Sequence, residues 1–188
     1  MNNRSNKNIS FYYYGQDHFI LNVYKFIKSQ IEKNNYVFLH CDDNLYNMLI
    51  RNLDSNEKNM VGRISLDKII MNPFFSMTNY KGEDNPLKEI KEFIYEGGFW
   101  GGNLIIDASC LIDSVGASSF LECIGNLSFI CKENNFNALT CYDFSDYINR
   151  NKRINEDIIK ASYSFHQFRF YANKVISSDN FNIDENLA

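Results

Sequence analysis

The sequence lacks the features that mark several large functional classes. Its five cysteines form no CxxC pair, which excludes common zinc-knuckle and thioredoxin motifs. No apolar run approaches the roughly 18–20 residues of a membrane span, and the polar start "MNNRSNKN" leads into no signal segment. The net charge is −4, and Lys and Arg are scattered rather than gathered in a basic stripe. These absences predict a cytoplasmic protein that binds neither nucleic acid nor membrane.

Motifs for nucleotide and hydrolase chemistry are missing as well. Neither GxxxxGK[ST] nor GxGxxG occurs, and there is no GxSxG elbow. The apolar strand that ends at Asp107 is similar to the magnesium-holding strand of P-loop enzymes, but no phosphate loop accompanies it. His40 and Cys41 are neighbours in a strand, so their side chains point to opposite faces and do not act as a pair. The sequence predicts no ATPase, no cofactor and no metal site, and most thiols are expected in the core.

What the chain does contain is the pattern of one ordinary globular domain. Hydrophobic residues make up 45% of its 188 positions, charged residues 22% and aromatic residues 15%. Apolar runs of strand length alternate with segments of helical spacing, which predicts right-handed βαβ units. The expected strands are 9–15, 36–42, 103–109, 137–143 and 174–178, and the expected helices are 16–34, 43–53, 86–98, 114–134 and 155–168. The predicted fold is therefore α/β, with a mostly parallel sheet and helices on both faces.

The remaining segments are assigned less regular roles. Residues 54–85 are expected to form a long, partly irregular excursion, with a strand in "VGRISL". Both prolines follow "SLDKII", one inside the excursion and one at the start of the helix 86–98. A single domain is expected over 8–178, flanked by polar tails at 1–7 and 179–188.

Polar residues gather where the predicted strands end. Ligands of open α/β sheets bind at the carboxyl ends of the strands, so these residues are the candidate binding site. The alternative for the aspartates is that each caps the helix after it, and the alternative for the histidine is a place in the core. The candidate ligand-binding residues are Tyr13, Tyr14, Asp42, Asp107, Ser109, Cys141, Asp143 and His166.

Several segments, taken in order, resemble the MEDS sensory domain. They are "ISFYYYGQDHFILNVYKFIKSQIEKNNYVFLHCDD", "GGFWGGNLIIDAS", "FLECIGNL" with Glu122, and "ALTCYD" followed by His166. The chain departs from that family where the first strand begins, because Asn-Ile-Ser (8–10) stands in place of a histidine. Gln167 stands where the family has proline, and Cys141 and Asp143 are one residue closer together.

The resemblance implies a core similar to KaiC/RecA-type ATPases without their phosphate loop. It further implies a non-catalytic sensory module of prokaryotic signal transduction. Such a module binds a small molecule, a partner signalling protein such as a kinase or transcription regulator, or a second copy of itself.

Two other functions stay open at the level of sequence. One is a small enzyme whose site combines Asp107, Cys141, Asp143 and His166, with the thiol as nucleophile. The other rests on "LIIDASCLIDSVGASSFLECI", which is similar to the strand–turn–helix of STAS-type antagonists. There Asp113 and Ser114 correspond to the phosphorylated pair, and the protein acts through protein–protein contacts.

Overall fold

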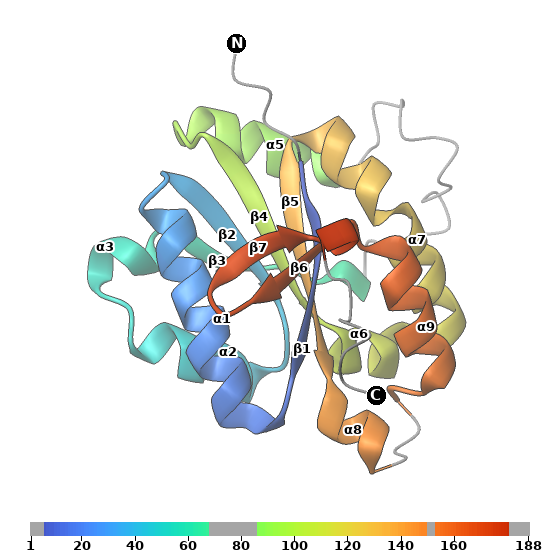
Figure 1. The fold of residues 1–188 in the computed structure, drawn as a ribbon. Helices are drawn as coiled ribbons and strands as arrows, with labels where there is room; N and C mark the ends of the chain where they lie inside the picture. The colour runs from blue at the N-terminus through green and yellow to red at the C-terminus, as the bar shows by residue number, and fades with distance from the viewer. Residues whose placement is uncertain (1–5, 68–85, 150–152, 181–188) are drawn as a thin grey trace.

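The computed structural model describes residues 6–67, 86–149 and 153–180, and these form an α/β fold built on one seven-stranded sheet. The strand order is β3-β2-β4-β5-β1-β6-β7, and every pairing is parallel except that of β6 with β7 (Figure 1). The predicted fold class is confirmed. The strands are β1 (Asn8–Tyr13), β2 (Asn35–His40), β3 (Val61–Arg63), β4 (Gly101–Asp107), β5 (Phe136–Asp143), β6 (Phe168–Tyr171) and β7 (Lys174–Ser177).

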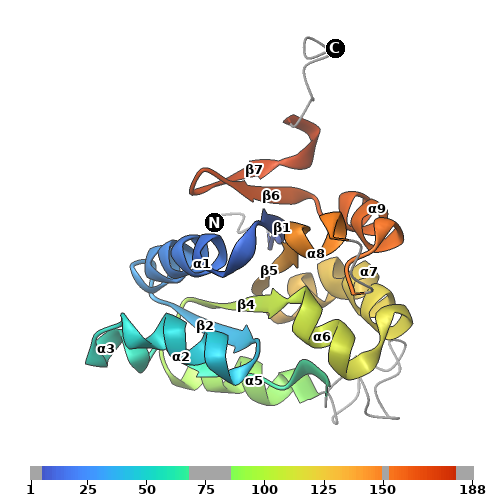
Figure 2. The same ribbon diagram turned by 90° about the horizontal axis from the view of Figure 1, so that it is seen from below.

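Helices cover both faces of the sheet, as Figure 2 shows from a second direction. Within the described residues they are α1 (Gly15–Ile31), α2 (Asp43–Arg51), α3 (Ser55–Lys58), α5 (Pro86–Glu96), α6 (Ala108–Val115), α7 (Ala117–Asn134), α8 (Phe144–Ile148) and α9 (Glu156–Phe165), followed by a 3-10 turn η2 (Ser178–Asn180). None of these helices has the length and apolar character needed to cross a membrane.

Alternation along the central strands divides the core into two parts. On β2, Val37 and Leu39 pack with α1 and α2, while Tyr36 and Phe38 pack with the opposite layer. The same parity holds in β1, β4 and β5, so odd-numbered residues face α1. We call this side the α1 face, and the side covered by α5, α6, α7 and α9 the α7 face.

The strands predicted to end at 15, 42 and 109 end two residues earlier, at Tyr13, His40 and Asp107. Two helix boundaries also differ from the prediction, each for a clear backbone reason. The helix expected over 114–134 is divided at Gly116, whose φ of 82° is not helical, and α6 already begins at Ala108. The helix expected to run to 168 ends at Phe165, because His166 adopts an extended conformation (φ −97°, ψ 121°). "FRFY" then forms β6, a strand that was not predicted from the sequence.

The described part of the predicted irregular excursion contains regular secondary structure. It contains α3, which begins with a capping box between Asp54 and Glu57, and then β3. Its remainder from 68 to 85 lies outside the described residues. In the predicted N-terminal tail, Asn6 donates a hydrogen bond to the carbonyl of Lys132, and the backbone of Lys7 donates one to Asn137.

Candidate functional site

The three aspartates at the carboxyl ends of the strands all cap helices. The side chains of Asp42, Asp107 and Asp143 accept hydrogen bonds from backbone N–H groups two or three residues further along, at 2.8, 3.2 and 2.9 Å. The capping interpretation of these residues is confirmed. Each carboxylate satisfies an N–H group that would otherwise have no partner in the first turn of its helix.

The connections at this end of the sheet are very short. Only Tyr14 separates β1 from α1, and no residue separates β4 from α6 or β5 from α8. A phosphate-binding loop needs several successive residues whose N–H groups point at the ligand. The β1–α1 connection offers no such length, and the N–H group of Gly15 is already donated to Ser145 Oγ at 3.1 Å.

Burial sets the chemistry of the groups that remain at the carboxyl end. Asp107 is 4% exposed, and burial raises its pKa to about 7, with the charges of Asp42 and Asp143 adding to the rise. Cys141 is fully buried, and burial raises its pKa well above the ordinary thiol value. At neutral pH this thiol stays protonated.

The other carboxyl-end candidates differ in exposure. Tyr13 is buried on the α1 face, and burial raises its pKa. Tyr14 is about half exposed. Ser109 is buried, and its hydroxyl has no hydrogen-bond partner. That these residues bind a ligand stays a prediction.

His166 does not join this group. It lies on the α7 face, where its Nε2 is 2.8 Å from the Tyr142 hydroxyl and its Nδ1 is 2.7 Å from Asn8 Oδ1. The amide nitrogen of Asn8 already donates to Ser128 and to a backbone carbonyl, so Asn8 Oδ1 accepts from His166 Nδ1–H. Nε2 then accepts from Tyr142. Burial lowers the pKa of His166 to about 3, which keeps the ring neutral in this network.

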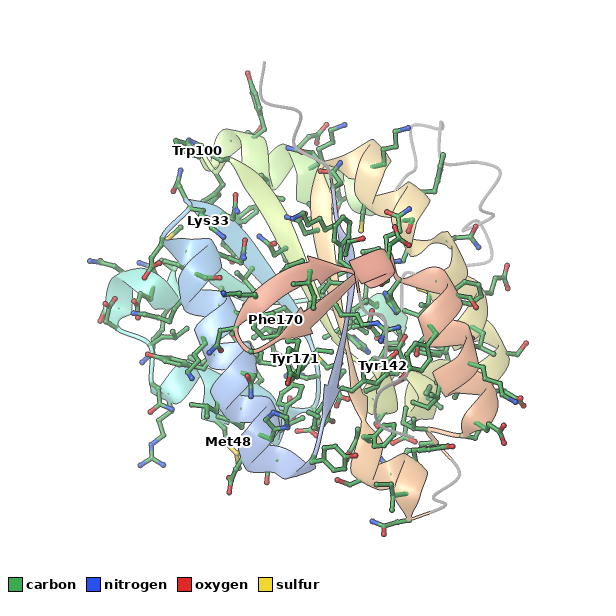
Figure 3. All side chains as sticks on the ribbon, viewed as in Figure 1. Lys33, Met48, Trp100, Tyr142, Phe170 and Tyr171 are labelled. Carbon is green, nitrogen blue, oxygen red and sulfur yellow. The ribbon has the colours of Figure 1, made fainter. Side chains whose placement is uncertain are left out.

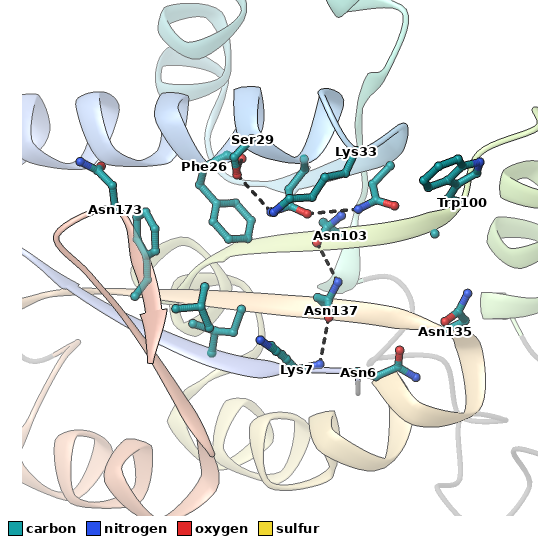
Figure 4. Close-up of a pocket in the computed structure, with 16 residues that line it drawn as sticks. Asn6, Lys7, Phe26, Ser29, Lys33, Trp100, Asn103, Asn135, Asn137 and Asn173 are labelled. Atoms are coloured by element: carbon teal, nitrogen blue, oxygen red, sulfur yellow. Dashed lines mark hydrogen bonds between the residues drawn. The ribbon is translucent and has the colours of Figure 1, made fainter. Parts of the chain in front are cut away.

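At the opposite, amino end of the sheet the α1 face opens into a cavity of about 610 Å³. Figure 4 shows it between the last turns of α1 and the starts of β4 and β5, with the β6–β7 hairpin on one side and Trp100 on the other. Its size is typical of small-molecule pockets. Seven carboxamide side chains line it: Asn6, Gln30, Asn35, Asn103, Asn135, Asn137 and Asn173.

Two hydrogen-bonded chains fix the orientation of the inner amides. In the first, the Asn137 amide nitrogen donates to Asn103 Oδ1 at 3.1 Å, and Asn137 Oδ1 accepts from the backbone of Lys7 at 3.0 Å. In the second, Asn35 donates to Gln30 Oε1 at 3.2 Å. One polar atom is left over, because the amide nitrogen of Asn103 is buried without a partner although the residue is only 1% exposed. A buried donor of this kind costs about 1–3 kcal/mol when it stays unpaired.

The rim of the cavity carries the only tryptophan in the sequence and two lysines. Trp100 is 60% exposed, and its backbone N–H donates to the carbonyl of Asn34 at 2.9 Å. Lys7 lies with its ammonium group 4.9 Å from the centre of the Phe168 ring. Lys33 is exposed just beyond the end of α1. Figure 3 shows where Lys33, Trp100 and Phe170 stand on the whole molecule.

The sequence carries a signal for this cavity, although the predicted site residues do not include it. Asn35 and Asn103 each stand at or near the start of a buried strand, and Asn137 does so in β5. Each has odd parity, so alternation sends all three to the same face as the apolar residues that follow. Amides on a face that otherwise packs against a helix are the pattern that would have indicated a polar pocket there.

Comparisons with known proteins add no relative. A scan against models of known families and a search of curated proteins both find no match. Among the described residues, no three His, Cys, Asp or Glu side chains gather in a way that could hold a metal ion. The candidate site therefore rests on the geometry of this chain.

Proposed function

We propose that this chain is a sensory module of signal transduction that binds a small molecule in the amide-lined cavity at the amino end of the sheet. The observation that carries the proposal is the unpaired amide nitrogen of Asn103 in the cavity wall. The cavity is polar, is of ligand size and contains a buried donor without a partner within the chain. A bound ligand atom that accepts this hydrogen bond would remove the penalty.

The elements around the cavity also offer a route for a signal. Phe170, Asn173 and Val175 of the β6–β7 hairpin line it opposite α1. The hairpin joins the rest of the sheet through a short ladder, in which only Ile9 and Ser10 of β1 have partners in β6. A ligand that contacts α1, the strand starts and the hairpin together would hold the hairpin against the domain. Ligand binding would then change the surface that this hairpin presents to a partner.

A partner protein or a second copy of the chain is the proposed receiver of that signal, in the cytoplasm. Large aromatic side chains stand exposed around the cavity and the hairpin, with Tyr95 85%, Tyr171 64% and Trp100 60% exposed. A groove bounded by α5, Phe99 and Trp100 adjoins the cavity. The MEDS resemblance supports the same type of protein, a sensor that acts through a partner.

The enzyme alternative finds less support in the described residues. Cys141 is fully buried as a thiol, and His166 lies on the other face of the sheet, hydrogen-bonded to Tyr142 rather than to Cys141 or Asp143. A cysteine nucleophile needs an accessible thiolate with an adjacent base. The STAS alternative assigns the phosphorylated pair to Asp113 and Ser114. In the structure Ser114 lies near the end of α6 and donates to the carbonyl of Cys110, while Asp113 pairs with Arg153.

Native mass spectrometry of protein purified from its own cells tests the proposal. Wild type should carry a bound small molecule, and Asn103→Asp should lose it. This variant keeps the oxygen that accepts from Asn137 and replaces only the unpaired NH₂ group. Asp107→Asn, on the same face of the same strand, is the matched control and should keep the ligand. Hydrogen exchange should show the β6–β7 amides protected when the ligand is present. A ligand that survives in Asn103→Asp and leaves in Asp107→Asn would move the site to the carboxyl end.

A further inference from the structure

Among the described residues, the charged side chains that line the amide-lined cavity are all of one sign. Lys7 precedes β1 and Lys33 follows α1, and the 16 lining residues include no Asp or Glu. A concave surface with two ammonium groups and no carboxylate has a positive potential, which concentrates anions.

The helix ends nearby act in the opposite direction, but more weakly. α1 and α7 both end at this cavity, and a helix C-terminus carries about half a negative charge. Part of that charge is already neutralised, because the carbonyl of Lys28 accepts from the N–H of Glu32 and that of Cys131 accepts from the N–H of Asn135. Two full positive charges exceed two partial negative ones, so the sum stays positive.

The hydrogen-bonding groups of the inner wall favour the same kind of ligand. Asn103 Oδ1 and Gln30 Oε1 each already accept a hydrogen bond, from Asn137 and Asn35, whereas the buried amide nitrogen of Asn103 has no acceptor among the described residues. Lysine ammonium groups donate and never accept. A ligand that completes this part of the wall supplies an acceptor oxygen for Asn103.

From the sign of the lining charges and the unpaired donor of Asn103 we infer that the ligand is a small oxyanion, a metabolite that carries a carboxylate or a phosphate group. This inference rests on the proposed function. The oxyanion accepts hydrogen bonds from Asn103 and is paired by Lys7 and Lys33, and the two lysines select it over a neutral molecule of the same shape. Such charge-assisted hydrogen bonds are stronger than neutral ones.

Titrations with three probes test the inference: succinate, inorganic phosphate and succinamide, the uncharged counterpart of succinate. Fluorescence of Trp100 at the rim and calorimetry give the affinities. Succinate or phosphate should bind at least tenfold more tightly than succinamide, and whichever anion is preferred identifies the carboxylate or the phosphate class. Lys7→Gln/Lys33→Gln should weaken the anion at least tenfold, while Lys25→Gln, an exposed lysine of α1 that does not line the cavity, should not.

The outcomes separate this inference from the proposed function. If succinamide binds as tightly as succinate, or if the double lysine variant binds both anions normally, the oxyanion inference is overturned and the pocket stands. If neither anion binds at about 10 mM, the inference is likewise overturned. If wild-type protein carries no small molecule after purification and also binds none of the three probes, both the proposed function and the oxyanion inference are overturned. A urea unfolding curve for each variant shows that it is folded.

Discussion

β4 and β5 carry polar side chains at both ends of the α1 face, but the two ends use them differently. At the carboxyl end Asp107 and Asp143 bond to the backbone of the helix that starts at the next residue. At the amino end Asn103 and Asn137 bond to one another, and one donor is left without a partner. Along β4, Asn103 and Asp107 are four residues apart, roughly 13 Å at about 3.3 Å per residue.

The difference comes from the lengths of the connections. Where a helix begins directly after a strand, the strand's last side chain is the nearest acceptor for the first N–H groups of the helix. No loop remains that could wall a cavity. At the amino end, α1 stops above the sheet and the hairpin stands opposite, which leaves space between them. A polar residue at a strand end thus indicates a binding site only where its hydrogen-bonding groups are not already paired with other groups of the chain.

The largest expected effect concerns His166, which the sequence reading had grouped with the carboxyl end. His166→Ala should lower the free energy of unfolding by about 3 kcal/mol, because it leaves Asn8 and Tyr142 unpaired in the core and creates a cavity. Tyr142→Phe should cost about 1–2 kcal/mol, because only one hydrogen bond is lost. Urea denaturation measures both. A His166→Ala protein of normal stability would place the histidine outside the structural core.

The next largest effect is the pH dependence of stability, in which Asp107 and His166 should act in opposite directions. The pKa of Asp107 is about 7 in the fold against an ordinary 3.8, so its contribution to stability is present at low pH and lost as pH rises toward 7. The pKa of His166 is about 3 against 6.5, so its contribution is present above pH 6.5 and lost as pH falls. Burial also lowers the pKa of His40, which adds to the second trend.

Between about pH 4 and 6.5 the two trends oppose one another, each at no more than about 1.4 kcal/mol per pH unit. Asp107→Asn should therefore become more stable as pH rises through this window. His166→Gln should become less stable over the same range. Unfolding curves at four or five pH values give the slopes, and parallel slopes in the two variants would contradict the assignment.

A smaller effect is expected from Asp42, an exposed cap, and Asp143, a partly buried one. Asp42→Ala and Asp143→Ala should each lower the free energy of unfolding by about 1 kcal/mol, the usual loss for an N-cap. Neither should change ligand binding in the amide-lined cavity. Thermal unfolding together with native mass spectrometry checks both statements. Loss of the ligand from a folded Asp143→Ala protein would restore the carboxyl end as the site.

The smallest expected effect is the number of cysteines that a thiol reagent labels in the folded protein. All five thiols are free, and Cys110 alone is not buried. Its pKa is raised to about 11 by burial and nearby carboxylates, so it should react slowly. A thiol reagent at neutral pH should label one cysteine per folded chain and five in denaturant. Rapid labelling of Cys141 in the folded protein would revive the enzyme alternative.

The sequence predicted the sheet well because buried strands leave a strong local signal. "NALTCYD" was placed as a strand to within one residue and "NLIIDAS" to within two at each end, since continuous apolar runs of that length have few other solutions. The division at Gly116 and the strand "FRFY" were missed. The first depends on one glycine dihedral, and the second depends on pairing with β1, far away in the sequence.

The candidate site was harder to predict because the hydrogen-bond partner of a side chain can be far away in the sequence. An aspartate at the end of a strand looks the same in sequence whether it binds a ligand or caps a helix. Asp143 caps α8 because that helix begins at the next residue, Phe144. His166 likewise contacts Asn8 across 158 positions of sequence. Spacing predicts which face a residue occupies, but not which distant group already fills its hydrogen-bonding capacity.

The position of β1 in the sheet has a consequence for how the protein is made. β1 lies between β5 and β6, and both of these strands follow it by more than 120 residues, so they leave the ribosome long after it. Asn8 and Ser10 are buried only once those strands arrive. β2, β3 and β4 can pair earlier, because their segments are closer together in the chain. Folding of this sheet during synthesis should therefore begin with β2, β3 and β4, and β1 should be inserted later.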